Sequence, residues 1–309
     1  MSLIRKPYEL SVPQNIKVLF YGQPGMGKTT LALSAPKPLL LDFDNGIHRV
    51  NYGHQSDAVQ ISNWKEALDV LAEDLSAYET IVVDTIGKML DYIITYVCPS
   101  GNPRIQDWGK INQEFSNFTR TASALNKNII YVAHRDIRKE GDDNVFVPAL
   151  REKSYSAIVT ELDLLGYVEA KGTTRTITFT PTSRNDGKNT CNLPGLMNIP
   201  TVVDAQGKAL TNIFFQNQII APYVANLSQR LETAKAYEII MGELKEQIML
   251  ITDDLSANDF VGRIDKFEHV ANSRAIAANL AHNKAISLGL KFNKEIKGYE
   301  KVQLQNSLV

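Results

Sequence analysis

Short continuous runs of apolar residues dominate the first half of the chain. They lie at residues 16–21, 39–44, 80–85 and 128–133. Continuous apolar runs of this length predict strands buried on both faces, which is typical of a parallel sheet. Helices are predicted between them, at 86–97 and along the apolar stripe from Trp108 to Ala122. Alternating strands and helices predict an α/β fold with a mostly parallel central sheet.

The connections between these elements differ in character. Two prolines and a glycine mark residues 98–104 as a loop. Residues 135–157 carry balanced charges and form a connection long enough to indicate either function or mobility. The runs at 162–169 and 174–180 predict a hairpin, and a polar turn follows at 184–188.

Helical periodicity replaces the strand pattern near residue 225. Apolar residues recur every three or four positions from Leu227 to Ile248 and again from Phe260 to Ala271. We therefore expect two domains, an α/β domain at residues 1–225 and a small C-terminal helical region of two or three helices at 226–309. Residues 274–301 are the most basic stretch, a pattern that usually marks a solvated face.

A phosphate-binding motif lies between the first strand and the helix that follows it. The pattern G-x-x-x-x-G-K-[ST] and the residue after it comprise Gly22, Gln23, Pro24, Gly25, Met26, Gly27, Lys28, Thr29 and Thr30. Backbone N–H groups of such a loop surround an anion. Lys28 would reach the β- and γ-phosphates, and Thr29 would hold Mg²⁺. The alternative is an ordinary glycine-rich turn, which both flanks of the motif disfavour.

Polar side chains end the three later strands. Asp42 and Asp44 close the second strand, and open α/β folds bind ligands at that edge of the sheet. Asp84 ends the third strand, as does the Mg²⁺-binding aspartate of phosphate-loop ATPases, although an acid after an apolar run is weak support alone. His134 ends the fourth strand, where it either senses the γ-phosphate or is merely solvated.

Composition indicates a soluble globular protein and limits its partners. Of 309 residues, 44% are hydrophobic and 22% charged, and the net charge of −1 gives no global support for nucleic-acid binding. The two cysteines form no metal or disulfide pattern. Without a signal-like segment or a run of about 18 apolar residues, we expect a cytoplasmic protein that does not span a membrane.

These motifs, in this order, resemble the RecA-like core of ATPases. More narrowly, they resemble phage-encoded nucleotide-binding proteins of the AAA class that act in recombination and single-strand annealing. The resemblance covers residues 14–225 and rests on the segments 22–29, 41–46, 81–85, 131–134, 163–167 and 184–188. It implies a RecA-like phosphate-loop ATPase domain, whereas the C-terminal region resembles the family only in being helical.

The resemblance also implies residue roles. Asp44 falls where the family has a glutamate that activates the attacking water, and its shorter side chain leaves that assignment open. His134 falls at the γ-phosphate sensor. Arg184 and Lys188 fall where related motors present cations to a neighbouring subunit's nucleotide, which requires a ring or filament of identical subunits.

Two functions from different classes remain open. The first is a Mg²⁺-dependent ATPase that binds single-stranded DNA through residues 98–107 and 135–157, where RecA-like proteins meet DNA, and that works with a single-strand-binding or annealing protein. The second is a nucleotide-switched assembly factor without DNA binding. A nucleotide kinase is a weaker alternative, since the chain lacks an arginine-rich lid.

Overall fold

The computed structural model describes residues 3–10 and 13–302 and divides into two compact units. One unit is Pro13–Leu227. The other combines the described parts of Met1–Val12 and Ser228–Val309. The described residues 3–10, which the sequence analysis placed in the α/β domain, thus group with the C-terminal unit.

A large central sheet organises the first unit. Its parallel strands are β1 (Lys17–Gly22), β2 (Pro38–Asp42), β3 (Ala58–Gln60), β4 (Thr80–Asp84), β5 (Asn128–Glu140) and β7 (Leu164–Lys171). They lie in the order β7-β1-β5-β4-β2-β3, so β5 separates the strand before the phosphate loop from the strand that ends in Asp84. The expected α/β fold with a mostly parallel central sheet is confirmed.

Antiparallel strands extend this sheet at one side. They are β8 (Thr174–Thr178), β9 (Lys188–Asn189) and β10 (Leu196–Ile199), and the β7–β8 hairpin was predicted from the sequence. The structure corrects the prediction for residues 135–157. Instead of an irregular connection, β5 continues to Glu140, pairs with β6 (Asp143–Pro148) and is followed by α5 (Glu152–Glu161).

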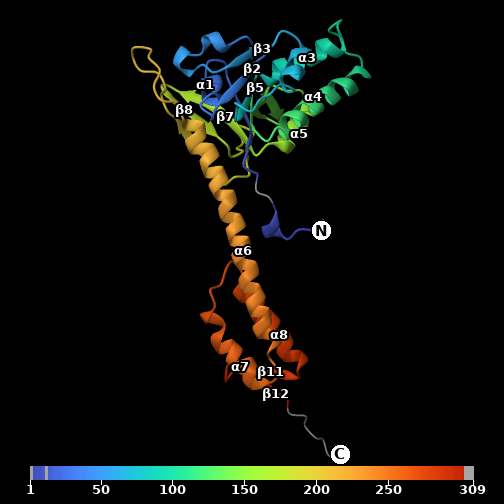
Figure 1. The fold of residues 1–309 in the computed structure, drawn as a ribbon, viewed down its shortest axis with the longest axis vertical. Helices are drawn as coiled ribbons and strands as arrows, with labels where there is room; N and C mark the ends of the chain where they lie inside the picture. Colours follow the sequence, from blue (N-terminus) through green and yellow to red (C-terminus); the bar gives the residue numbers. More distant parts are fainter. Residues whose placement is uncertain (1–2, 11–12, 303–309) are drawn as a thin grey trace, which may run out of the picture. The chain divides into compact units, whose positions relative to one another are not determined.

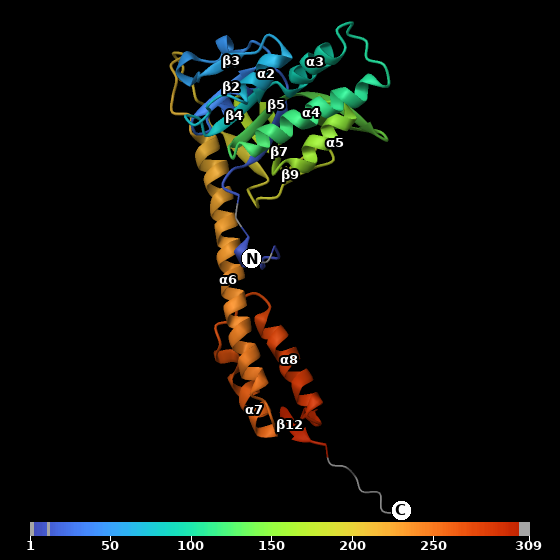
Figure 2. The same cartoon turned by 45° about the vertical axis from the view of Figure 1, so that its right-hand side comes forward.

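Helices cover both faces of the sheet because alternate side chains of each strand are buried on opposite sides. Leu19 and Tyr21 pack with α2 (Trp64–Val70), α3 (Ile86–Val97), α4 (Asp107–Ala124) and α5. Figures 1 and 2 show α3, α4 and α5 over this face. Val18 and Phe20 pack on the other face with α1 (Lys28–Ala32) and with residues of η4 (Gln216–Ile220). Short helical turns η2 (Ile47–Arg49) and η3 (Tyr52–His54) lie between β2 and β3.

The second unit has its own apolar core. It contains η1 (Pro7–Glu9), most of α6 (Ala221–Met249), α7 (Asp254–Arg263), η5 (Ile264–Lys266) and α8 (Ser273–Ser287). The expected helices are present, and a hairpin of β11 (Leu290–Asn293) and β12 (Gly298–Lys301) is added to them. Across both units, the described helices include none that is long and apolar enough to cross a membrane.

Candidate functional site

The phosphate loop turns sharply between β1 and α1, and two of its glycines are required by the geometry. A Cβ atom on Gly22 would lie 2.3 Å from the carbonyl oxygen of Val168 on β7. Gly27 has a φ of +79°, which side-chain-bearing residues rarely adopt. The motif therefore folds into a close turn whose next residue, Lys28, begins α1.

Lys28 is turned back onto its own loop. Its side-chain amine donates hydrogen bonds to the carbonyl oxygens of Gly22 (3.0 Å) and Gln23 (2.8 Å), and the residue is only 6% exposed. Burial lowers the pKa of Lys28 below its ordinary value, while the charges of Asp84 and Asp44 oppose that shift. A buried cation thus lies in the loop where an anion would bind.

Thr29 and Asp84 meet across the sheet edge. The Thr29 hydroxyl donates a 2.5 Å hydrogen bond to Asp84 Oδ2. Burial, together with the charges of Asp44 and Asp42, raises the pKa of Asp84 to about 6, although Thr29 and Lys28 oppose the shift. A buried carboxylate beside a hydroxyl is an oxygen donor set of the kind that Mg²⁺ prefers, so these residues fit the expected metal.

The two acids at the end of β2 have different surroundings. Asp42 is 1% exposed, and its carboxylate accepts hydrogen bonds from the backbone N–H groups of Gly46 and Ile47, both at 2.9 Å. This carboxylate holds the turn after the strand. Asp44 lies within that turn and lines a cavity together with Lys28 and Asp84.

His134 lies beside Asp44 at the centre of the sheet edge. Strand register pairs it with Gly22, because β5 runs parallel between β1 and β4. Its Nε2 atom is 3.6 Å from Asp44 Oδ2. The neighbouring imidazole lowers the pKa of Asp44 below its ordinary value, while burial of the carboxyl opposes the shift. The carboxyl group of Asp44 therefore favours its charged form more than an ordinary aspartate does.

One cavity of about 250 Å³ unites most of the residues that the sequence singled out. Its lining includes Pro24, Gly25, Gly27, Lys28, Thr29, Thr30, Asp44, Asp84 and His134, with Arg49 and Thr85 in addition. Gly22, Gln23 and Met26 are not part of that lining among the described residues, although the first two hold Lys28 through their carbonyl oxygens.

Arg184 and Lys188 lie outside this cavity. The Lys188 amine donates hydrogen bonds to the carbonyl oxygens of Val159 (2.8 Å) and Thr160 (3.1 Å), near the end of α5. Arg184 pairs with Glu169 at 3.4 Å and its side chain is 55% exposed. Of the two cations, Arg184 is the more available to another molecule.

Sequence inspection missed Arg175, on β8. A Cβ atom on Gly27 would come within 3.2 Å of Arg175 Nη1, so this guanidinium lies against the phosphate loop. With Met26 and Val202 it also lines a second cavity of about 660 Å³ that, like the first, borders Gly25. A single arginine in a strand carries no motif, and only the pairing of β8 with β7 brings it to the loop.

Comparisons with known proteins find distant relatives. The SPβ prophage-derived uncharacterized protein YorG of Bacillus subtilis strain 168 is 22% identical over 170 residues, which are 50% of this chain and 51% of that protein. The chain thus spans about half the length of this curated relative.

Among solved structures, the KaiC-like protein PH0186 of Pyrococcus horikoshii OT3 aligns with a TM-score of 0.35 and 11% identity, covering 53% of this chain and 77% of its own. A second solved structure, the ATPase domain of another protein, aligns with a TM-score of 0.40 and 11% identity, covering 64% of this chain and 85% of its own.

A family model described as AAA domain matches residues 14–191, more than half of this 309-residue chain. The matched region contains the phosphate loop, Asp44, Asp84 and His134, the same residues that meet at the sheet edge. The chain therefore belongs to the AAA domain family.

Proposed function

We propose that this protein is a Mg²⁺-dependent ATPase that acts on single-stranded DNA in recombination or strand annealing. The observation that carries the ATPase part is the contact between Thr29 and Asp84 beside the buried amine of Lys28. These groups form a site for the phosphates of ATP and for a metal ion. When bound, Mg²⁺ would neutralise charge on the phosphate oxygens.

Other residues of the chain would bind the phosphates, accept the proton and hold the nucleoside. Lys28 would leave the carbonyl oxygens of Gly22 and Gln23 and donate instead to the phosphates. Asp44, which lies beside His134, would accept a proton from the attacking water, and His134 would contact the γ-phosphate. The nucleoside would extend past Gly25 into the second cavity, where Arg175 lies.

The DNA and assembly parts of the proposal rest on surface groups. The β5–β6 hairpin carries exposed Arg138 and Lys139 beyond the sheet edge, and Arg184 is exposed enough to act on a neighbouring subunit's nucleotide in a ring or filament. A single-strand-binding or annealing protein would be the partner. The acids Glu140, Asp142 and Asp143 at the same hairpin turn favour the second candidate, a nucleotide-switched assembly factor without DNA binding.

Two measurements test these proposals. ATP hydrolysis by the Lys28→Ala variant should be abolished and its ATP affinity reduced, and an unchanged rate would refute the ATPase site. Hydrolysis by the wild type should rise with single-stranded DNA, whose binding should weaken steeply with salt. Absence of binding at low salt would favour the assembly factor. Sedimentation with and without ATP would then detect the oligomer.

A further inference from the structure

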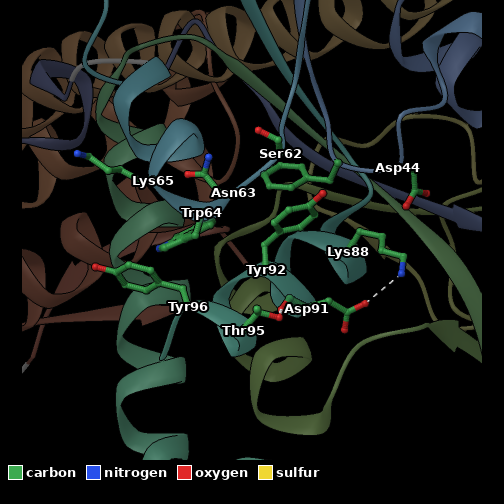
Figure 3. Close-up of a pocket in the computed structure, with 11 residues that line it drawn as sticks. Asp44, Ser62, Asn63, Trp64, Lys65, Lys88, Asp91, Tyr92, Thr95 and Tyr96 are labelled. Atoms are coloured by element: carbon green, nitrogen blue, oxygen red, sulfur yellow. Dashed lines mark hydrogen bonds and ion pairs between the residues drawn. The ribbon is translucent and has the colours of Figure 1, made fainter. Parts of the chain in front are cut away.

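A third cavity, of about 490 Å³, lies on the other side of Asp44 between α2 and α3. We call it the α2–α3 pocket. Four aromatic side chains line it, Phe43, Trp64, Tyr92 and Tyr96. Figure 3 shows Trp64, Tyr92 and Tyr96 along its length, with Asp44 near one end. Asp44 also lines the nucleotide cavity, so one carboxylate borders both spaces.

The Tyr92 and Trp64 side chains of this pocket have their polar atoms bonded elsewhere. The Tyr92 hydroxyl donates to the carbonyl oxygen of Ile61 at 3.0 Å, and the Trp64 indole N–H donates to Glu114 at 3.1 Å. Because Trp64 is only 2% exposed and Tyr92 is half-buried, Tyr92 is the one of the two whose ring surface a ligand could reach. Tyr96 is different, because 57% of it is exposed, which leaves its ring available for stacking.

The charges of the pocket are balanced. Lys88 pairs with Asp91 at 3.4 Å, and Lys65 and Asp44 add one charge of each sign. Lys65 is exposed and has no ion-pair partner within the part of the chain that the structure describes. This lining suits a flat, uncharged ring with one anionic group beside it, which describes a base and its phosphate better than a compact polyanion.

Tyr96 also connects the pocket to a surface loop. It lies in the last turn of α3, which ends at Val97 and leads into residues 98–106. That loop carries exposed Arg104 and Ile105, the latter 95% exposed. A DNA strand bound along this loop would therefore pass Tyr96 before it reaches Asp44.

We infer that the α2–α3 pocket binds one base of single-stranded DNA. A base in the pocket would change the surroundings of the Asp44 carboxylate and so couple DNA binding to ATP hydrolysis. This inference rests on the proposed ATPase function. The base would stack on Tyr96 and Tyr92, with its phosphate near Lys65. It would also contact Lys88, whose charge acts on Asp44. Such recognition tolerates any base sequence, because every base has a stacking face.

The test compares three variants, Tyr96→Ala, Tyr96→Phe and Tyr52→Ala. Tyr52 is 89% exposed and lies outside the pocket, so it controls for loss of an exposed ring. Oligothymidylate that carries 2-aminopurine reports stacking without requiring hydrolysis. We expect Tyr96→Ala to bind it about 5- to 150-fold more weakly and to lose DNA stimulation, with basal hydrolysis unchanged. Tyr96→Phe and Tyr52→Ala should behave as the wild type.

Other results would overturn the inference in identifiable ways. Normal 2-aminopurine quenching and stimulation in Tyr96→Ala would exclude a base in the pocket. If oligonucleotides with abasic sites stimulate ATP hydrolysis as well as intact ones do, base stacking in the pocket is excluded. A sedimentation change in Tyr96→Ala with unaltered DNA affinity would assign the pocket to a neighbouring copy. If wild-type and Lys28→Ala proteins hydrolyse ATP alike, the proposed ATPase function fails, whereas the quenching assay still judges the pocket.

Discussion

Replacing Asp84 with asparagine should stabilise the protein while it removes activity. A rise in the pKa of Asp84 from 3.8 to about 6 means that ionising this buried carboxylate costs the folded state about 3 kcal/mol at pH 7. Asparagine keeps the shape and an acceptor for Thr29 but carries no charge. For a unit of this size, 3 kcal/mol corresponds to an increase in Tm of up to about 6–12 °C.

The pH dependence gives the sign of this effect. Because the folded pKa lies above the unfolded value, Asp84 contributes stability below about pH 4 that is lost as the pH rises through about 6. Thermal unfolding of wild type and Asp84→Asn should therefore agree near pH 4 and separate above pH 6. Addition of ADP and Mg²⁺ should raise the Tm of the wild type more than that of the variant.

A matched control is available at the end of β2, the strand that pairs with β4. Asp42→Asn also neutralises a buried acid, but that carboxylate accepts two backbone N–H bonds, from Gly46 and Ile47. An amide group cannot accept both in the same way, so this variant should lose about 1–3 kcal/mol of unfolding free energy. If Asp84→Asn is no more stable than the wild type at pH 7.5, or if the difference persists at pH 4, the electrostatic reasoning is wrong.

Three further predictions concern the phosphate site. Asp44→Asn should bind a fluorescent ATP analogue normally but lower kcat about 10²- to 10⁴-fold, and retained turnover would place the base elsewhere. Arg175→Ala should weaken ATP binding about 10-fold in the same assay, since a charge-assisted hydrogen bond to the bound nucleotide would be lost. An unchanged Kd would show that Arg175 does not contact the nucleotide. Gly22→Ala should lower the Tm, because the new Cβ atom would clash with the Val168 carbonyl oxygen. Gly109→Ala, in an exposed turn of α4 with open space around it, should instead raise stability by about 0.5–1 kcal/mol, and equal Tm changes in the two glycine variants would contradict this reasoning.

The buried part of the fold could be predicted from the sequence because its residues face one environment. Strands β1, β2, β4 and the first half of β5 are apolar on both sides, which leaves a continuous signal. These strands end at the same edge of the sheet, so the polar side chains at their ends could be expected to lie close together.

The second half of β5 carries no such signal. From Arg135 onward this strand is mostly exposed and pairs only with β6 as a hairpin, so its residues form no apolar face. Charged residues therefore concealed a regular strand. The β11–β12 hairpin escaped prediction for a similar reason, because each strand has four residues within a segment dominated by helices.

Within the site, side-chain roles depended on turns that sequence patterns do not specify. Asp42 and Asp44 end the same apolar run, yet one is hydrogen-bonded by the following turn and the other faces the cavity. Arg175 reaches the phosphate loop only through strand pairing. Periodicity locates elements along the chain, whereas these contacts depend on how separate elements meet.

The unbroken length of β5 has a mechanical consequence. His134, beside the phosphate loop, and Glu140, at the hairpin turn, belong to one strand with no break between them. At a rise of about 3.3 Å per residue, the intervening backbone spans about 20 Å. When this segment moves as one rigid body, a tilt of about 5° at His134 displaces the hairpin turn by about 2 Å. A small tilt of β5 at His134 when the γ-phosphate is lost would thus move the β5–β6 turn far enough to make or break a contact on the protein surface.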